Sequence, residues 1–522
     1  MSEDARASIK NPFTEDFDNF AGELLKEWKV PGTSAALITE NQVFTTAYGH
    51  ATLPDTCATP ETLWFGASIT KAFTAALLAH LIDGKEYASQ LPQGWATPIS
   101  AIIPLDFVLQ DEWATKNLTL EDAVCHRTGY SRHDFSLASE VDGVPQHPGD
   151  VVRNLRNLPG MSAAPRTKFL YSNTMYIVLS HVVETLTGKT LGSALREYIW
   201  TPLGMNSTYL YLADAEKGAE HLATGYYWDP DTKAYKDTPP TTGTEISGAG
   251  GIISNVTDFA KWVQCMLTKG KPFSPAVHND IRKSRILGGM PTAPFDVDLY
   301  GLGWQRTLYK GHVLYRHGGG LFAFGSDVIW FPERKIGFVA FGNAANLGAN
   351  AVAEMLAFRA FDDVLGIAQE DRHDFTSRWH GFSAMLKQAQ NKAVESVYPT
   401  VPEHPLPPML SVEKLAGTYY DAGYKGFTLR VEPHRTDPGK RILMGERKDM
   451  AWRYTTELHH VTGNHWILYM CDMYNPHSLL RQFAGAEFRI GADGEVASLD
   501  VHFVNRIGEP VDEGIVSFKR KT

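Results

Sequence analysis

Ser68 and Lys71 are the first and last residues of the sequence SITK, and this spacing could activate a serine nucleophile. They open a run rich in Ala and Leu, residues 69–82, which predicts a helix ended by Gly84. A lysine three residues after a serine lies one turn further along the same helix face, within reach of the serine oxygen. An amine held there can accept the serine proton, and the helix N-terminus places backbone amides beside the oxygen. The pair is therefore a candidate for acyl transfer.

The context of this short pattern matters because S-x-x-K occurs by chance in many proteins. Lys71 stands inside an apolar run that should form a buried helix, where an unpaired ammonium group would be costly. The alternative, in which Ser68 caps the helix and Lys71 points into solvent, stays open at this point.

Tyr171 and Asn173 form a second candidate, in the sequence YSN just before an apolar run that predicts a helix over 175–186. A phenol and an amide two residues apart can point the same way from an extended segment. Tyr171 could then exchange protons with a nucleophile, and Asn173 could hold a substrate carbonyl. The alternative is a buried tyrosine followed by an asparagine that caps the helix.

The sequence His317-Gly318-Gly319-Gly320 is a third candidate and follows a predicted strand over 312–315. Glycines let a substrate approach the backbone closely, so amides there can stabilise an oxyanion. The alternative is a glycine-rich bend. Phe322 and Phe324 follow the glycines and suggest a bulky or apolar acyl group, with core packing as the alternative reading.

The three segments, in this order, resemble the S-x-x-K, Y-x-N and K-T-G or H-x-G boxes of the serine β-lactamase and penicillin-binding-protein-like hydrolases. This superfamily includes class C β-lactamases, D-aminopeptidases, family VIII carboxylesterases and fungal acyl transesterases. The resemblance covers about residues 15–365 and extends to four further stretches, Leu120–Gly129, Pro202–Met205, Gly250–Trp262 and Tyr300–Trp304.

The resemblance implies a role for each candidate residue. Ser68 is the implied nucleophile and Lys71 the amine that activates it, while Tyr171 is the general base in acylation and the acid toward the leaving group. The implied substrate and oxyanion contacts come from Asn173, His317, Gly319 and Gly320, with the backbone N–H groups of Ser68 and Gly320 forming the oxyanion hole. No metal or organic cofactor is implied.

His317 stands where many family members have the lysine of K-T-G. That lysine is a permanent cation suited to the carboxylate of penicillins and of peptide C-termini, whereas a histidine is mostly neutral at pH 7. We therefore expect neither efficient β-lactamase nor D,D-carboxypeptidase activity. The isolated histidines His126 and His133 are interpreted as structural or surface residues.

Competing catalytic motifs are incomplete. The segment around Ser68 lacks the second glycine of G-x-S-x-G, so the α/β-hydrolase reading of His317–Gly320 fails. Gly188-Lys189-Thr190 ends like a P-loop, but Val183 occupies the position of the required earlier glycine.

Composition excludes several other classes of protein. The 522 residues are 43% hydrophobic and 21% charged, which is typical of a globular protein, and the formal net charge of −10 argues against nucleic-acid binding. The N-terminal residues are charged throughout, and the longest apolar helical run, 72–82, is far short of the ~20 residues that a membrane span needs. The four cysteines are far apart, so we expect reduced thiols. These observations predict a cytoplasmic protein with no membrane or nucleic-acid partner.

The sequence predicts two domains joined by a linker. Five prolines fall within residues 398–408, so the predicted divisions are a hydrolase domain over 1–397, a linker over 398–410 and a second domain over 411–522. Strand-like runs at both ends of the first domain predict an α+β fold, in which an antiparallel sheet is completed by both termini and flanked by helices. The family resemblance adds an all-α part. Short alternating runs predict a small β-barrel after the linker, which resembles a lipocalin-like domain.

We predict a serine hydrolase or acyltransferase that forms an acyl-enzyme at Ser68 from a small-molecule ester, thioester or amide, with secondary metabolism as one setting. The expected partner is that acyl substrate, with a carrier-protein- or CoA-linked donor as an alternative. Two other functions stay open: a D-stereospecific aminopeptidase or amidase, and an idle binding module with the barrel as ligand carrier. Retention of Ser68, Lys71 and Tyr171 argues against the idle module.

Overall fold

The computed structural model describes residues 9–240, 243–434, 437, 439–506 and 510–521, which fall into two compact units. The first, called the sheet unit, comprises residues 1–94, 186–242 and 247–379. The second, called the barrel unit, comprises residues 95–185, 243–246 and 380–522. The two units group residues that pack together and are not the domains predicted from the sequence. The domain limits at 397 and 411 stay predictions.

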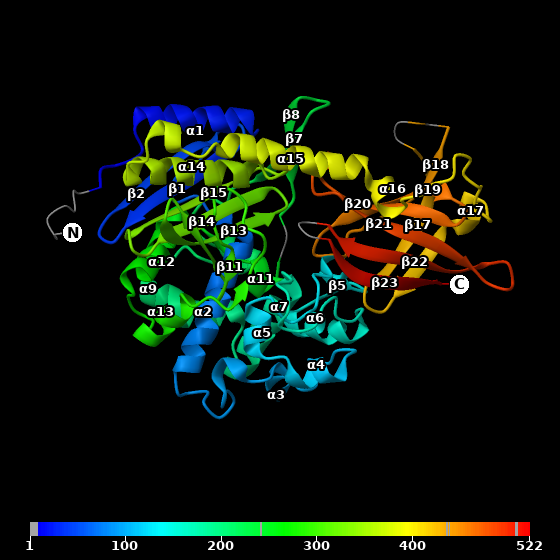
Figure 1. Cartoon of the computed structure of the whole chain (residues 1–522), viewed down its shortest axis with the longest axis horizontal. Coiled ribbons are helices and arrows are strands. Elements are labelled where there is room, and N and C mark those ends of the chain that lie inside the picture. The colour runs from blue at the N-terminus through cyan, green and yellow to red at the C-terminus, as the bar shows by residue number, and fades with distance from the viewer. Residues whose placement is uncertain (1–8, 241–242, 435–436, 438, 507–509, 522) are drawn as a thin grey trace. The chain divides into compact units, whose positions relative to one another are not determined.

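A nine-stranded antiparallel sheet forms the centre of the sheet unit, in the order β10-β11-β12-β13-β14-β15-β1-β2-β3 (Figure 1). β1 (Gly32–Thr39) pairs with β15 (Ile336–Gly342), so the first strand of the chain and a strand some 300 residues later are neighbours, as predicted. The other strands are β2 (Val43–Thr52), β3 (Thr56–Cys57), β10 (Ile286–Leu287), β11 (Leu299–Tyr300), β12 (Gln305–Tyr309), β13 (His312–Leu321) and β14 (Phe324–Phe331).

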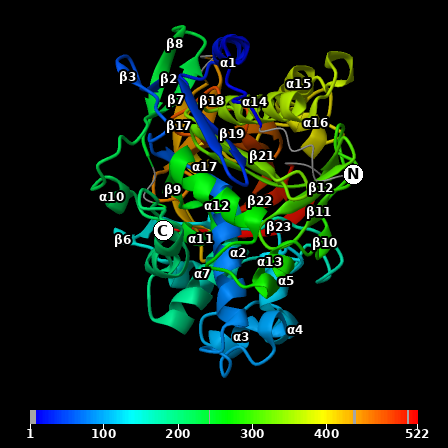
Figure 2. The same cartoon turned by 90° about the vertical axis from the view of Figure 1, so that its left-hand side faces the viewer.

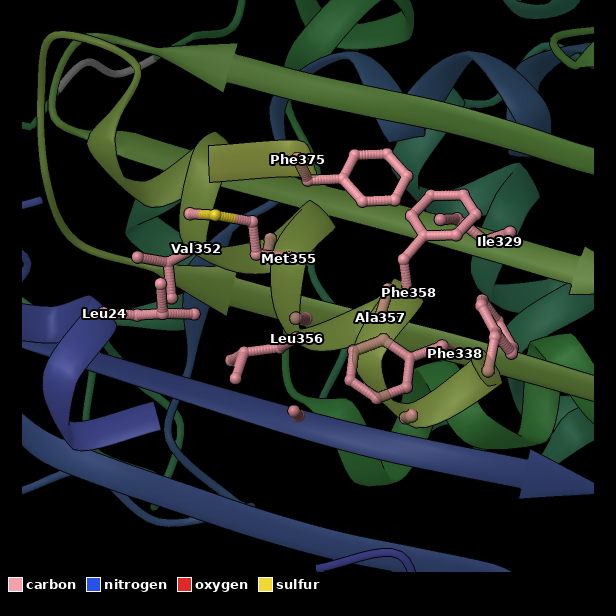
Figure 3. Close-up of a cluster of buried hydrophobic side chains, with 14 of the residues drawn as sticks. Leu24, Ile329, Phe338, Val352, Met355, Leu356, Ala357, Phe358 and Phe375 are labelled. Carbon is pink, nitrogen blue, oxygen red and sulfur yellow. The ribbon is translucent and has the colours of Figure 1, made fainter. Parts of the chain in front are cut away.

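Helices cover both faces of this sheet because alternate residues of its central strands are apolar on each side. Phe338 of β15 belongs to a buried cluster with α14 (Gly348–Leu365) and α1 (Glu15–Glu27), shown in Figure 3. Phe341 of the same strand instead meets Phe259 of α12 (Val256–Thr268), with ring centroids 5.3 Å apart. Each such buried side chain contributes about 1.5–3 kcal/mol, so the core holds the sheet rigidly.

The predicted helix after Ser68 is α2 (Thr70–Asp83), which is buried along almost its whole length and ends at Gly84. A helix that is apolar all round must be enclosed by other elements. Phe73 of α2 stacks on Trp262 of α12 with ring centroids 4.2 Å apart, and both views show the two helices close together (Figures 1 and 2). The remaining elements of this unit are β4 (Trp64–Phe65), α8 (Leu191–Leu195), α9 (Thr201–Leu203), α10 (Leu212–Ala215), β7 (Gly225–Asp229), β8 (Ala234–Thr238), α11 (Ser247–Gly250), β9 (Ile253–Ser254) and α13 (Pro275–Ile281).

The barrel unit contains a closed barrel in which each of eight strands pairs with the next and the last returns to the first, as predicted. Aromatic rings in mutual contact occupy its interior, among them Trp466 and Phe488 at 5.7 Å and Tyr424 and Phe503 at 4.7 Å. The strands are β16 (Gly417–Asp421), β17 (Lys425–Pro433), β18 (Arg441–Arg447), β19 (Tyr454–Thr462), β20 (His465–Asp472), β21 (Gln482–Ile490), β22 (Val496–Asn505) and β23 (Val511–Arg520).

A mainly helical part joins the barrel in the same unit. Its elements are α3 (Ile99–Ile102), α4 (Glu112–Asn117), α5 (Leu120–Val124), β5 (Glu140–Val141), β6 (Val144–Pro145), α6 (Pro148–Asn154) and the greater part of α7 (Asn173–Thr187). Two short helices pack on the barrel itself: α16 (Ala393–Val397) on β20 and β21, and α17 (Val412–Leu415) on β17 and β18. α15 (Phe375–Asn391), which the sequence analysis missed, begins in the sheet unit and ends in the barrel unit.

The proline-rich segment 398–410 contains neither helix nor strand. It is fastened to the barrel, because Tyr398 Oη donates to the Trp466 carbonyl at 2.7 Å and Leu406 N donates to Thr462 Oγ1 at 3.0 Å. Within the described part of the chain, no helix has the length and apolar character needed to cross a bilayer.

Candidate active site

Ser68 lies in a tight turn between β4 and α2 in the sheet unit. Residues Ala67–Ile69 form a single 3₁₀ turn, and Ala67 adopts a left-handed conformation with φ +52°. A left-handed backbone is unusual for a residue with a side chain and marks a position held by its surroundings. Ser68 is half-buried whereas its neighbours on both sides are buried, so the turn presents the serine at the surface of the core.

Lys71 is fully buried and contacts Ser68 as the spacing predicted. Its Nζ lies 3.1 Å from Ser68 Oγ and donates to the carbonyl of Ala249 in α11 at 2.7 Å. A buried amine costs less when its hydrogen bonds are satisfied, and the carbonyl also fixes the direction of the lysine. The reading in which Lys71 points into solvent is therefore wrong.

The His317–Gly320 segment forms the second half of strand β13, where the sequence left a bend open as the alternative. His317 pairs with Val328 of β14 and Gly320 pairs with Gly325, so the glycines continue the ladder. The bend reading is therefore wrong, because sheet pairing on β14 overrides the turn preference of glycine. Position 319 requires a glycine, because a Cβ there would lie 2.1 Å from the Gly66 carbonyl oxygen.

His317 is 5% exposed and makes two hydrogen bonds that fix its tautomer. Nδ1 lies 2.7 Å from the Gly318 carbonyl oxygen, which can only accept, so Nδ1 carries the proton. Nε2 then accepts from the hydroxyl of Tyr300 at 3.3 Å. Burial, together with the positive charge of nearby Lys71, lowers the pKa of His317 to about 3, although the Gly318 carbonyl acts in the opposite direction. The imidazole is neutral at physiological pH, as the sequence predicted.

A small apolar pocket adjoins these segments in the sheet unit. It is lined by Phe65, Thr238, Pro239, Pro240, Leu321, Phe322, Ala323 and Phe324. Phe324 is buried, and its ring centroid lies 5.0 Å from that of Phe65, so it serves as a wall of this pocket as well as a core residue. Two of its walls thus come from segments next to the predicted site: Phe65 precedes Ser68 by three residues, and Leu321 directly follows Gly320.

Tyr171 and Asn173 lie at the start of α7 in the barrel unit. His126 accepts a hydrogen bond from the Ser172 amide at 3.1 Å and stacks near Tyr171 with centroids 4.4 Å apart. Asn173 Nδ2 donates to Asp134 Oδ1 at 3.0 Å, and the guanidinium of Arg132 lies 5.2 Å from the Tyr171 ring centroid. His126 is thus structural, as interpreted from the sequence.

Sequence reasoning missed three residues that contact the predicted site residues: Tyr300 beside His317, and Arg132 and Asp134 beside Tyr171 and Asn173. Arg132 and Asp134 stand in a loop whose only signal was two opposite charges two residues apart, and Tyr300 was noted only as part of a family-like stretch.

The predicted site residues form two groups. Ser68, Lys71, His317, Gly319 and Gly320 lie in the sheet unit, and Tyr171 and Asn173 lie in the barrel unit.

Comparison with known families identifies the chain. The Beta-lactamase family model matches residues 17–360. The chain belongs to this family. An unguisins hydrolase from Aspergillus campestris is 34% identical over 500 residues, which cover 96% of this chain and 91% of that relative. An unguisins hydrolase from Aspergillus violaceofuscus is 39% identical over 441 residues, which cover 81% of this chain and 77% of the relative.

Among solved structures, the octameric penicillin-binding protein homologue from Pyrococcus abyssi superposes with a TM-score of 0.60 at 21% identity, covering 97% of this chain and 99% of the other. This likeness concerns the fold. It confirms the predicted β-lactamase/transpeptidase-like architecture with its C-terminal barrel. The β-lactamase-like protein is a serine hydrolase, as predicted from the ordered motifs.

Proposed function

We propose that Ser68 attacks the carbonyl carbon of a small-molecule ester, thioester or amide and forms an acyl-enzyme. The observation that carries this proposal is the 3.1 Å contact between Lys71 Nζ and Ser68 Oγ at a half-buried turn. A serine hydroxyl is a weak nucleophile, and a fixed amine beside it is a recognised means of activation. The buried carbonyl of Ala249 keeps that amine in place.

Acylation begins when Tyr171, acting as general base with the Lys71 amine beside the serine, takes the proton of the Ser68 hydroxyl. The serine oxygen then forms a bond to the substrate carbonyl carbon. The carbonyl oxygen becomes an oxyanion that the backbone N–H groups of Ser68 and Gly320 stabilise. The bond to the leaving group then breaks, and Tyr171 returns a proton to that group. Water attacks the acyl-enzyme in the same manner, which releases the acid and restores the Ser68 hydroxyl.

The neutral state of His317 restricts the substrate class. A lysine at this place would offer a formal positive charge to a substrate carboxylate, whereas His317 offers an uncharged ring held by Tyr300. We therefore propose substrates without a carboxylate next to the reacting carbonyl. Two relatives are named unguisins hydrolases, so unguisins are the first substrates to test.

A substrate panel tests the proposal and the alternatives. The wild type and Ser68→Ala are exposed to short and long p-nitrophenyl esters, a D-amino-acid amide, a penicillin and an unguisin, and turnover is measured. We expect the wild type alone to turn over an ester, amide or unguisin, and penicillin to react poorly. Equal turnover by Ser68→Ala would overturn the proposal. Strict preference for the D-amino-acid amide would select the D-stereospecific amidase instead.

A further inference from the structure

The barrel contacts the loop that surrounds the Tyr171 and Asn173 side chains, and these contacts lie within the barrel unit. We infer that Glu513, on barrel strand β23, is a positioning residue that holds Tyr171 and Asn173 in their working arrangement. The inference rests on the proposed function of these two residues. Glu513 itself contacts neither of them and acts through residues 131–134.

A single carboxylate oxygen of Glu513 binds this loop segment on both sides of Arg132. Its Oε1 accepts from the Ser131 hydroxyl at 2.7 Å and from the His133 amide at 3.2 Å, so it brackets Arg132. Glu513 is 6% exposed, and hydrogen bonds to a buried carboxylate are among the stronger ones. The carboxylate thus determines the path of the backbone on either side of Arg132.

The backbone at His133 needs such support because its φ is +47°, in the left-handed region. This conformation costs a residue with a side chain about 1–3 kcal/mol and persists only when surrounding contacts impose it. A second barrel residue supplies another contact, since His133 Nδ1 lies 2.9 Å from Tyr424 Oη. The barrel therefore holds the strained residue at both its backbone and its side chain.

The two residues flanking His133 connect this loop to the site. Arg132 Nε donates to Asp134 Oδ2 at 2.7 Å, while Asp134 Oδ1 accepts from Asn173 Nδ2 at 3.0 Å. The guanidinium carbon of Arg132 lies 5.2 Å from the Tyr171 ring centroid. Because the left-handed residue lies between them, a change in its conformation would redirect Arg132 and Asp134 together.

Glu513 also supplies charge to this arrangement. Burial alone would lower the pKa of Arg132, but the nearby groups Asp134, Tyr171 and Glu513 raise it overall. Arg132 therefore stays a cation beside the Tyr171 ring. Replacing Glu513 with a neutral residue removes one of the negative charges that offset the buried guanidinium.

Other contacts hold the helical part to the barrel and supply a matched control. Ser139 Oγ donates to the Asp449 carbonyl at 2.9 Å, and Asn154 Nδ2 donates to the Gly423 carbonyl at 2.8 Å. Neither bond includes residues 131–134. Ser139→Ala thus removes a hydrogen bond to the barrel without releasing the loop.

The test compares Glu513→Ala, Glu513→Gln and Ser139→Ala in the full chain. Acylation of Ser68 by a p-nitrophenyl ester is followed by intact mass, and amide hydrogen exchange is followed in the peptides that cover 131–134 and 171–173. We expect Glu513→Ala to slow acylation about 10- to 100-fold, the scale of a misplacement near 1 Å. Exchange should rise in both peptides, whereas Ser139→Ala should behave as the wild type.

Glu513→Gln keeps an oxygen acceptor for the Ser131 hydroxyl and the His133 amide, so we expect it to recover part of the acylation rate lost in Glu513→Ala. This variant also serves as the test if Glu513→Ala does not fold. Wild-type acylation rates and exchange in the Glu513 variants would overturn the inference while leaving the proposed function intact. A wild type that no probe acylates at Ser68 would instead remove the proposed function and, with it, this inference.

Discussion

The side-chain nitrogen of Lys71 lies 3.1 Å from the hydroxyl oxygen of Ser68, and the lysine has no exposed surface. The buried lysine side chain has few orientations available, because Nζ donates a hydrogen bond to the Ala249 carbonyl. The contact gives the Ser68 turn an amine that solvent does not compete for.

Removal of the Lys71 amine should slow acylation of Ser68. We expect Lys71→Met, which keeps an unbranched chain of similar length, to lower the acylation rate about 10²–10⁴-fold, the usual range for loss of a positioned acid or base. Lys71→Arg keeps the positive charge, but a guanidinium stays protonated and cannot act as a base. We therefore expect this variant to acylate nearly as slowly as Lys71→Met. Rapid-mixing mass spectrometry measures both rates. A Lys71→Arg variant with wild-type acylation would show that only the charge matters.

A methyl group at position 319 should damage the site, and one at 318 should not. A Cβ at Gly319 would lie 2.1 Å from the Gly66 carbonyl oxygen and 2.4 Å from Ser326 Oγ, whereas one at Gly318 meets nothing closer than 3.7 Å. We expect Gly319→Ala to cost about 1–3 kcal/mol of unfolding free energy and to disturb the Ser68 turn. Gly318→Ala is the control. Urea unfolding measures the stability of both variants, and ester turnover measures their activity. Equal stability and equal turnover of Gly319→Ala and Gly318→Ala would contradict this prediction.

His317 should make the protein less stable in acid. Its pKa falls from the ordinary 6.5 to about 3 on folding, so the unfolded chain binds more protons than the folded one between these values. Unfolding free energy therefore decreases as pH falls through this window, by up to about 1.4 kcal/mol per pH unit. His317→Gln removes this contribution, so its stability should depend less on pH between 6 and 4 than that of the wild type. If the unfolding free energies of the wild type and His317→Gln changed equally with pH, His317 would not be buried as a neutral ring.

A buried ion network should dominate the stability of the β13–β14–α14 region. Arg316 donates to Asp327 Oδ2 at 2.5 Å and to Glu354 Oε1 at 2.6 Å, and all three side chains are at most 14% exposed. We expect Arg316→Met to cost about 3–5 kcal/mol because it leaves the buried Asp327 carboxylate without its cation, whereas Glu354 keeps Arg378.

The control for that variant breaks an exposed pair. Lys116 and Glu112 lie 2.7 Å apart with side chains 67% and 84% exposed, so Lys116→Met should cost less than about 1 kcal/mol. Urea unfolding of both variants measures the difference. A cost below about 1 kcal/mol for Arg316→Met would contradict the prediction and mean that the Asp327 carboxyl is neutral without Arg316.

Local spacing explains what the sequence could predict about the site. Ser68 and Lys71 are three residues apart in one helical segment, so helix geometry alone brings them together. The strand character of His317–Gly320 was harder to predict, because glycine favours bends and only pairing with β14 keeps the chain extended. The fold class was accessible because the strands at both ends of the domain have strong apolar patterns.

Residues that act through long-range contacts left no such signal. Ser131 and Glu513 are 382 residues apart in the chain, and no pattern near either one indicates the other. The left-handed backbone of His133 could not be predicted either, because only a small minority of histidines adopt this conformation although they do so more often than most residues. Such contacts become known only once the barrel and the helical part are folded together.

The covalent role of Ser68 is the central claim, and peptide mapping of the trapped acyl-enzyme tests it most directly. The wild type is mixed with a slowly hydrolysed p-nitrophenyl ester, quenched in acid, digested and sequenced by tandem mass spectrometry. We predict one acyl group on the hydroxyl of Ser68 and none in the Ser68→Ala protein. Turnover of the ester with the acyl group on another residue, or with no covalent adduct at any time point, would contradict the account.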